Sequence, residues 1–255
     1  MNQEWEFQYS VRRSPAGGVI ELTAEEMEKH LLDRLKNEPD SVRQILCELG
    51  RFYGDMKQEE RAIACFREVL NREPDLERKA ACVLAMGATM EQVGNFQGAV
   101  RFYKEAFSME PTHTDTWYFI NNNLGYSLNQ LGRYEDGLDF CRRAVEIDPK
   151  RFNAHKNVGI SLAALGRFAE AAECFVTATR LNASDSRALG HLEDLLKEHP
   201  ELSFEFENKL ELCRQAVSVA RKAYEAAQPV VRRGWRRRLF IWRMKLRMYL
   251  RRILK

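Results

Sequence analysis

The sequence lacks long runs of apolar residues, although 45% of its 255 residues are hydrophobic. A membrane-spanning helix needs roughly 18 to 20 consecutive apolar residues, so no such helix is expected. The first residues, Met1 to Glu6, also lack the basic and apolar regions of a signal peptide. We therefore expect a cytoplasmic protein, with a peripheral position at a membrane surface as the alternative.

The residue patterns of enzyme and metal sites are absent as well. The six cysteines contain no Cys-x-x-Cys pair, and the five histidines are spread along the chain without metal-ligand spacing. No glycine-rich phosphate loop and no Gly-x-Ser-x-Gly motif are present. We interpret the cysteines as reduced packing residues. We predict a protein that is not an enzyme and that holds no cofactor and no metal.

Charge is distributed unevenly along the chain. Residues 229–255 contain eleven lysines and arginines and no acidic residue, whereas residues 1–228 carry 29 basic and 37 acidic side chains, a net charge of −8. The body and the C-terminal tail are therefore opposite in charge, and the tail is expected to prefer anionic partners.

What the sequence does contain is a repeat of 34 residues between positions 118 and 185. Leu124-Gly125 matches Val158-Gly159, and Leu131-Gly132-Arg133 matches Leu165-Gly166-Arg167. Apolar residues at spacings of three, four and seven on both sides of Gly132 predict two amphipathic helices joined by a short turn. A fixed period of this length is typical of a solenoid, in which each unit packs only against its neighbours.

This helix-turn-helix unit resembles the tetratricopeptide repeat, which has small residues at its eighth, twentieth and twenty-seventh positions. Gly125, Gly137 and Ala144 hold these positions here. The resemblance implies an all-α fold, a right-handed superhelical solenoid of antiparallel helix pairs. It covers four units, which are residues 43–76, 80–113, 118–151 and 152–185.

The segments that flank the repeats are expected to close the two ends of the solenoid. Residues 1–22 alternate apolar and polar side chains and predict a β-hairpin or an extended arm. Residues 23–42 predict a leading capping helix, which opens with a capping box. Residues 186–228 predict a degenerate repeat and a capping helix, whose apolar stripe could instead form a coiled-coil seam between two copies. Residues 229–255 predict a basic amphipathic helix.

A binding site is implied by the family resemblance. In tetratricopeptide proteins the first helices line a concave groove, and an asparagine at the sixth position of a unit binds the backbone of an extended peptide. Asn123 and Asn157 share this position, whereas the first two units carry Glu48 and Ala85. The alternative is that these asparagines are solvated or bridge adjacent helices. The candidate groove residues are Phe119, Asn122, Asn123, Tyr126, Asn153, Lys156, Asn157 and Ile160.

The basic tail is the second candidate site. Its aromatic and aliphatic residues recur at the spacing of one helix face, and basic residues fill most of the remaining surface. This pattern is typical of a helix at an anionic membrane surface. The same helix could bind a nucleic-acid backbone, or dock into an acidic groove of its own or of a neighbouring chain. The candidate contact residues are Trp235, Arg236, Leu239, Trp242, Arg243, Leu246, Tyr249 and Ile253.

Taken together, these features predict a non-enzymatic scaffold for protein–protein interaction. It would bind a peptide segment or a partner protein in the groove and use the tail for localisation or assembly. The alternative is a membrane-surface or nucleic-acid binding module in which the tail is the active part. Self-association through the tail or the capping helix is a further expectation.

Overall fold

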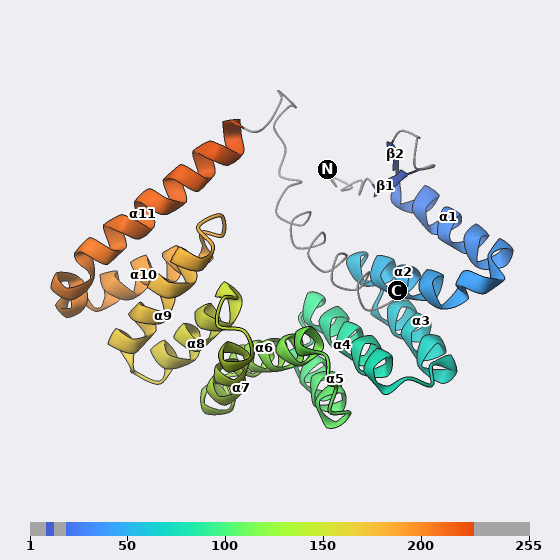
Figure 1. Ribbon diagram of the computed structural model, residues 1–255, viewed down its shortest axis with the longest axis horizontal. Helices are drawn as coiled ribbons and strands as arrows, with labels where there is room; N and C mark the ends of the chain where they lie inside the picture. Colours follow the sequence, from blue (N-terminus) through green and yellow to red (C-terminus); the bar gives the residue numbers. More distant parts are fainter. Residues whose placement is uncertain (1–8, 13–18, 227–255) are drawn as a thin grey trace, which may run out of the picture. The chain divides into compact units, whose positions relative to one another are not determined.

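The computed structural model describes residues 9–12 and 19–226 of the chain. These residues belong to two compact units, which are divided between Pro74 and Asp75. Figure 1 shows that both units are built from helices that follow one another in sequence order.

The first unit opens with a β-hairpin and a capped helix. Strand β1 (Tyr9–Arg12) pairs antiparallel with β2 (Val19–Leu22), so the hairpin is present rather than an extended arm. Helix α1 (Ala24–Asn37) begins at a capping box. The Thr23 hydroxyl accepts a hydrogen bond from the Glu26 amide at 3.2 Å, and the Thr23 amide donates to the Glu26 carboxylate at 2.8 Å. This reciprocal pair satisfies two backbone donors and fixes the start of the helix.

The rest of the first unit is one helix pair. After a 3₁₀ turn at Pro39–Ser41, helix α2 (Val42–Asp55) packs against α1 and lies antiparallel to α3 (Glu59–Arg72). Gly50 in α2 faces the Phe66 ring closely enough that a Cβ at Gly50 would lie 2.8 Å from it. The small residue is therefore what allows the two helices to approach.

The second unit stacks three helix pairs. Its helices are α4 (Leu76–Gln92), α5 (Phe96–Ser108), α6 (Thr114–Gln130), α7 (Tyr134–Ile147), α8 (Phe152–Ala164) and α9 (Phe168–Leu181). Each first helix contacts its own partner and the following first helix, so α4 packs on α6 and α6 on α8 (Figure 1). Helices α4 and α6 begin one turn before the repeat register at residues 80 and 118. The short insertions between the repeats account for these early starts.

The glycines of the repeat fill two structural roles. Gly132 and Gly166 end the turns after α6 and α8 with φ of 74° and 75°, a left-handed conformation that suits glycine. Gly125 and Gly159 lie within helices, where a Cβ would stand 2.4 Å from the Cys141 sulfur and 2.6 Å from the Phe175 ring, respectively. The predicted close approach of the paired helices is present at both positions.

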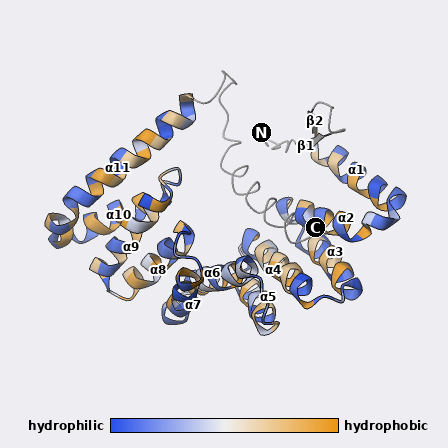
Figure 2. Cartoon of the chain, in the orientation of Figure 1, coloured by the Kyte–Doolittle hydropathy of each residue, from blue (hydrophilic) through white to orange (hydrophobic). Residues whose placement is uncertain are grey.

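The second unit ends in two helices that cover the last repeat. Helix α10 (Arg187–Glu198) leads through a 3₁₀ turn at Pro200–Leu202 into α11 (Ser203–Ala226). Helix α11 packs on α9 and α10 through the fully buried side chains of Phe206 and Cys213. The hydropathy colouring of Figure 2 shows hydrophobic residues recurring along α11. The inner side of α11 therefore caps the apolar core of the repeats.

The cysteines are packing residues rather than cross-links. All six are free thiols, and Cys47, Cys82, Cys141 and Cys213 are buried. Burial raises the pKa of the Cys141 thiol to about 12, which keeps it protonated at neutral pH. Within residues 9–12 and 19–226 no helix has the length and apolar character that crossing a membrane would require.

Candidate functional site

The candidate groove residues lie on the side of the second unit formed by α4, α6 and α8, which we call the first-helix face. They divide into two groups by exposure. Phe119, Asn123, Tyr126, Asn153 and Ile160 are half-buried, whereas Asn122, Lys156 and Asn157 are buried. Buried polar side chains need internal partners, because an unsatisfied polar group costs about 1 to 3 kcal/mol.

The side-chain amide of Asn157 finds its partners inside the protein. Its nitrogen donates to the Asn122 oxygen across to α6 at 3.1 Å, and its oxygen accepts from the Lys156 ammonium at 2.8 Å. Asn157 therefore bridges two neighbouring first helices, which is one of the alternatives that the sequence left open. Both the nitrogen and the oxygen of the Asn157 side chain therefore bond within the protein. Binding of a peptide by Asn157 itself stays a prediction.

Asn129 and Ser161 extend this polar contact along the same two helices. The Asn129 amide nitrogen donates to the backbone carbonyl of Asn157 at 3.1 Å, and the Ser161 hydroxyl donates to the Asn129 oxygen at 2.8 Å. The oxygen of Asn129 also fills the space beside Gly137, where a Cβ would lie 2.2 Å from it. We refer to the hydrogen-bonded residues Asn122, Asn129, Lys156, Asn157 and Ser161 as the polar seam.

A half-buried acid lies at the other end of the face, on α4. The Tyr103 hydroxyl donates to the Glu91 carboxylate at 2.9 Å. Burial raises the pKa of Glu91 to about 7, although the hydrogen bond from Tyr103 and the charge of Lys156 act in the opposite direction. Glu91 therefore keeps its proton to a higher pH than an ordinary glutamate does.

Lys156 is the buried cation of the site. Burial and, to a smaller extent, the Arg187 guanidinium lower the pKa of its ammonium, Asp185 and Glu91 offset part of this decrease, and the resulting pKa is about 8. The ammonium also lies 5.7 Å from the centre of the Tyr126 ring, within the range of a cation–π contact. Lys156 thus links the polar seam to the half-buried aromatic side chain of α6.

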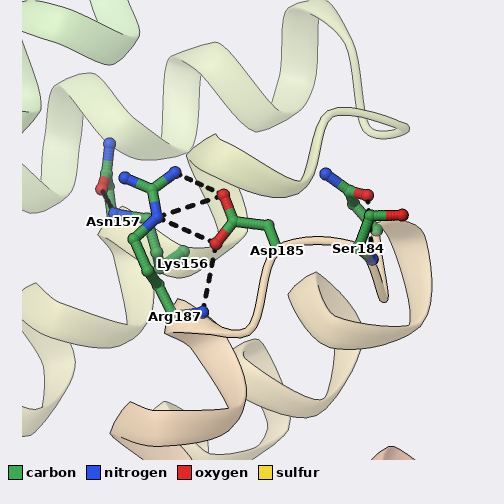
Figure 3. Close-up of polar contacts among 6 residues, drawn as sticks. Lys156, Asn157, Ser184, Asp185 and Arg187 are labelled. Carbon is green, nitrogen blue, oxygen red and sulfur yellow. Dashed lines mark hydrogen bonds and ion pairs between the residues drawn. The ribbon is translucent and has the colours of Figure 1, made fainter. Parts of the chain in front are cut away.

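An ion pair at the start of α10, between Asp185 and Arg187, contributes to the pKa of Lys156. The Arg187 guanidinium donates to both carboxylate oxygens of Asp185, with Nε 2.9 Å from Oδ1 and Nη2 2.5 Å from Oδ2. Figure 3 shows this bidentate pair, with Lys156 and Asn157 of α8 close to the guanidinium. Burial alone would raise the pKa of Asp185, but hydrogen bonds from Arg187 outweigh it and hold that pKa below its usual range.

Six residues of this site were not among the predicted groove residues, namely Asn129, Ser161, Glu91, Tyr103, Asp185 and Arg187. Glu91 occupies the twelfth position of the second unit, the same position that Asn129 holds in the third. Applying the groove register to the second unit would therefore have identified Glu91. Arg187 follows the last repeat, where no register applies, so no comparable signal was available for it.

The site presents half-buried side chains above a layer of buried hydrogen bonds. The half-buried aromatic, aliphatic and amide side chains can contact a polypeptide, while the polar seam holds the helices beneath them in place. Within the part of the chain that the structure describes, no group of three His, Cys, Asp or Glu side chains could hold a metal ion. The predicted tail contacts, Trp235, Arg236, Leu239, Trp242, Arg243, Leu246, Tyr249 and Ile253, lie outside the described residues.

Comparison with known sequences connects this geometry to a family. The family model described as "Tetratricopeptide repeat" matches residues 44–76 and 120–151. Human tetratricopeptide repeat protein 7B is 32% identical over 145 residues, which are 56% of this chain and 16% of the relative. The mouse cell division cycle protein 16 homolog is 24% identical over 151 residues, or 56% of this chain and 24% of the relative. The chain thus spans less than a quarter of the length of either relative.

Solved structures share the fold at low sequence identity. The crystal structure of BtubC from P. vanneervenii aligns with a TM-score of 0.62 and 18% identity, and covers 83% of this chain and 93% of that one. YrrB, described as a TPR protein with an unusual peptide-binding site, aligns with a TM-score of 0.52 and 19% identity, and covers 78% and 99%. These similarities establish the helix-pair fold.

Proposed function

Because this chain belongs to the tetratricopeptide repeat family, we propose that it is a non-enzymatic scaffold that binds a segment of a partner protein on its first-helix face. The similarity to YrrB, whose description names a peptide-binding site, supports a polypeptide ligand. The observation that carries the proposal is the rigid polar seam beneath half-buried side chains. A surface that is already ordered before binding loses less conformational freedom when the ligand arrives.

The ligand contacts are assigned to the half-buried group. The Asn122 amide nitrogen donates to the Asn123 side-chain oxygen at 2.9 Å. On its other side, Asn123 forms a hydrogen bond with Tyr103, whose hydroxyl also contacts Glu91. Tyr126 packs edge to face on Phe96 with ring centres 6.1 Å apart. Both side chains are held in place by neighbours and still reach the surface. A tyrosine in this setting offers apolar area and a hydroxyl to a peptide.

The seam asparagines have a supporting role in this proposal. Asn157 and Asn122 hold α6 and α8 in a fixed register, so that Tyr126 on one helix and Ile160 on the other keep their spacing. An extended peptide that spans both helices would then meet side chains at fixed intervals. This differs from the role that the family resemblance implies for Asn157, because its amide groups bond within the protein.

The test is a binding measurement on substituted full-length chains. A partner would be identified by affinity capture and its bound segment mapped, and the affinity for that segment would be measured by titration calorimetry. Asn123→Ala combined with Tyr126→Ala is expected to weaken binding by tenfold or more, about 1.4 kcal/mol. The matched control is Glu135→Ala combined with Arg142→Ala, two exposed positions on α7.

Circular dichroism of both double variants separates lost binding from lost folding. Equal affinity of the wild type and the Asn123/Tyr126 variant, with helix content unchanged in both, would place the ligand elsewhere and overturn the site assignment. Equal loss in the α7 control would point to the second-helix side as the binding surface.

A further inference from the structure

The half-buried amide of Asn123 is bonded on two sides to other polar groups of the protein. Its oxygen accepts a hydrogen bond from the Asn122 nitrogen at 2.9 Å. Burial raises the pKa of Tyr103, whereas the hydrogen bond between Asn123 and the Tyr103 hydroxyl acts to lower that pKa. A bond that lowers the pKa of a phenol stabilises its charged oxygen, so the Asn123 nitrogen is the donor. Asn123 thus accepts on one side and donates on the other.

The hydrogen bonds continue beyond both of these neighbours in the same direction. The Asn122 oxygen accepts from the Asn157 nitrogen at 3.1 Å, and the Asn157 oxygen accepts from the Lys156 ammonium at 2.8 Å. At the opposite end, the Tyr103 hydroxyl donates to the Glu91 carboxylate at 2.9 Å. We call these residues the donor series. In the donating direction its members are Lys156, Asn157, Asn122, Asn123, Tyr103 and Glu91.

The two charged ends determine this direction. The Lys156 ammonium has donors and no acceptor, so the Asn157 oxygen has to face it. The nitrogen on the other branch of that amide then faces the next residue, which has to present an oxygen, and the same requirement passes to each amide in turn. The ionised Glu91 carboxylate can only accept, so it takes the Tyr103 proton and leaves the phenol oxygen free to accept.

Burial makes a reversed amide costly. The side chains of Asn122, Asn157 and Lys156 belong to residues that are 6%, 3% and 6% exposed, so water has little access to replace a lost bond. Turning one amide over would bring two oxygens or two nitrogens together at each of its neighbours. Hydrogen bonds that run in one direction also polarise one another, which favours the observed order further.

We propose that Lys156 and Glu91 are positioning residues that hold the Asn123 amide in one orientation for the ligand. This inference rests on the proposed binding function, in which Asn123 is a ligand contact. Lys156 and Glu91 act through the donor series and need not touch the ligand. Each polar atom of the Asn123 amide keeps the capacity for one further hydrogen bond, so a bound peptide meets a donor and an acceptor at fixed places.

Nuclear magnetic resonance tests this orientation without a ligand. The side-chain amide signals of Asn123 are recorded in a nitrogen–proton correlation spectrum of the full-length protein. Lys156→Met removes the donor end of the series and Glu91→Leu removes its acceptor end, so each is expected to shift or broaden these signals. Lys156→Arg keeps a donor and Glu91→Gln keeps an acceptor, so both should stay closer to the wild type.

Two controls decide whether the effect passes through the series. Lys104→Met, at an exposed position of α5, should leave the Asn123 signals unchanged. Asn122→Ala interrupts the series between Lys156 and Asn123, so Lys156→Met should shift the signals no further in that background. An equal shift with and without Asn122, or no shift in Lys156→Met, would overturn the proposal.

Binding to the segment mapped by affinity capture provides the second readout. Lys156→Met and Glu91→Leu are each expected to weaken the affinity threefold or more while circular dichroism shows unchanged helix content. Neither change should weaken it further once Asn123 is replaced by alanine. Unchanged affinity of Asn123→Ala would refute the proposed binding site itself. A loss in Asn123→Ala, with wild-type affinity in both end variants, would refute only the positioning role.

Discussion

The inside of a helix pair and the contact between neighbouring pairs use different physical means in this protein. Within the α6–α7 and α8–α9 pairs, glycines meet Cys141 and Phe175 at distances that leave no room for a Cβ. Between α6 and α8, by contrast, buried amides, a hydroxyl and an ammonium are joined by hydrogen bonds. The first contact is defined by shape, whereas the second is defined by the pairing of donors and acceptors.

The two kinds of contact respond differently when the helices are displaced. Apolar contacts depend on distance but only weakly on direction, so a small rotation about the contact costs them little. Buried amides tolerate such a rotation poorly, since a displaced donor loses its partner and its hydration together. The polar seam therefore fixes how α8 is placed against α6, which is the relation that a ligand spanning both helices would sense.

The largest expected effect comes from the buried charge of the seam. Burial lowers the pKa of Lys156 from 10.5 to about 8, so between these values the unfolded chain holds a proton that the folded chain has released. Stability contributed by this group therefore rises as the pH rises from 8 to 10.5, by about 3 kcal/mol at roughly 1.4 kcal/mol per unit. Lys156→Met cannot titrate. The difference in the free energy of unfolding between wild type and variant should change by that amount in urea titrations across the window.

The control for this experiment is Lys104→Met on α5. Its side chain is exposed, so its ammonium keeps its hydration in the folded state. A Lys156→Met protein whose stability followed the wild-type pH dependence throughout would mean that the ammonium of Lys156 is not desolvated. The seam would then be an ordinary solvated contact.

The second-largest expected effect tests the close contact inside the α6–α7 pair. A Cβ at Gly125 would stand 2.4 Å from the Cys141 sulfur and 2.8 Å from the Gly137 carbonyl oxygen, and the carbonyl belongs to the backbone. Gly125→Ala is expected to lower the free energy of unfolding by about 2 kcal/mol, since overpacking of 1 to 3 kcal/mol exceeds the gain in helix propensity.

Gly190→Ala is the matched substitution in α10. No heavy atom lies within 4 Å of the Cβ that it would add, so the same chemical change should stabilise the protein by about 0.5 to 1 kcal/mol. Urea denaturation of both variants measures the contrast. If both changes stabilised the protein, the helices of the α6–α7 pair would be farther apart than the structure places them.

The shape-defined contact was predictable from the sequence and the polar seam was not. Gly125 and Gly159 recur at the 34-residue period, and a costly mid-helix glycine already implies a close neighbour. The partner of Asn157 could not be inferred in this way. Its sixth-position register places it on the first-helix face, but whether its amide turns toward a ligand or toward Asn122 depends on how two helix pairs are set against each other.

The exposed apolar residues of α11 show a related limit. The sequence predicted one apolar stripe, through Phe206 and Cys213, and the structure buries these residues on the preceding helices. Leu212 and Val219 lie outside that stripe and are 66% and 67% exposed. Only the exposure of these side chains in the folded chain distinguishes them from the buried apolar residues of the same helix.

The smallest expected effect concerns a single hydrogen bond of the seam. The buried hydroxyl of Ser161 donates to the Asn129 oxygen at 2.8 Å. Ser161→Ala leaves that oxygen without this donor and should lower the free energy of unfolding by about 1 kcal/mol. Ser218→Ala, the same change at an exposed position of α11, should stay within about 0.5 kcal/mol of the wild type.

A double-mutant cycle with Asn129→Ala decides whether the effect belongs to the bond. Asn129→Ala also removes the donor to the Asn157 carbonyl, so its own cost should be the larger of the two. Once Asn129 is absent, the Ser161 hydroxyl keeps only its hydrogen bond to the Asn157 carbonyl at 3.1 Å. Its loss should then cost less than in the wild type, and urea denaturation of the four proteins should yield a coupling energy of about 0.5 to 1 kcal/mol. Additive costs would mean that the two side chains act independently. The contact between α6 and α8 would then depend on shape alone, like the inside of a helix pair, and the first-helix face would lose the fixed register on which a bound peptide depends.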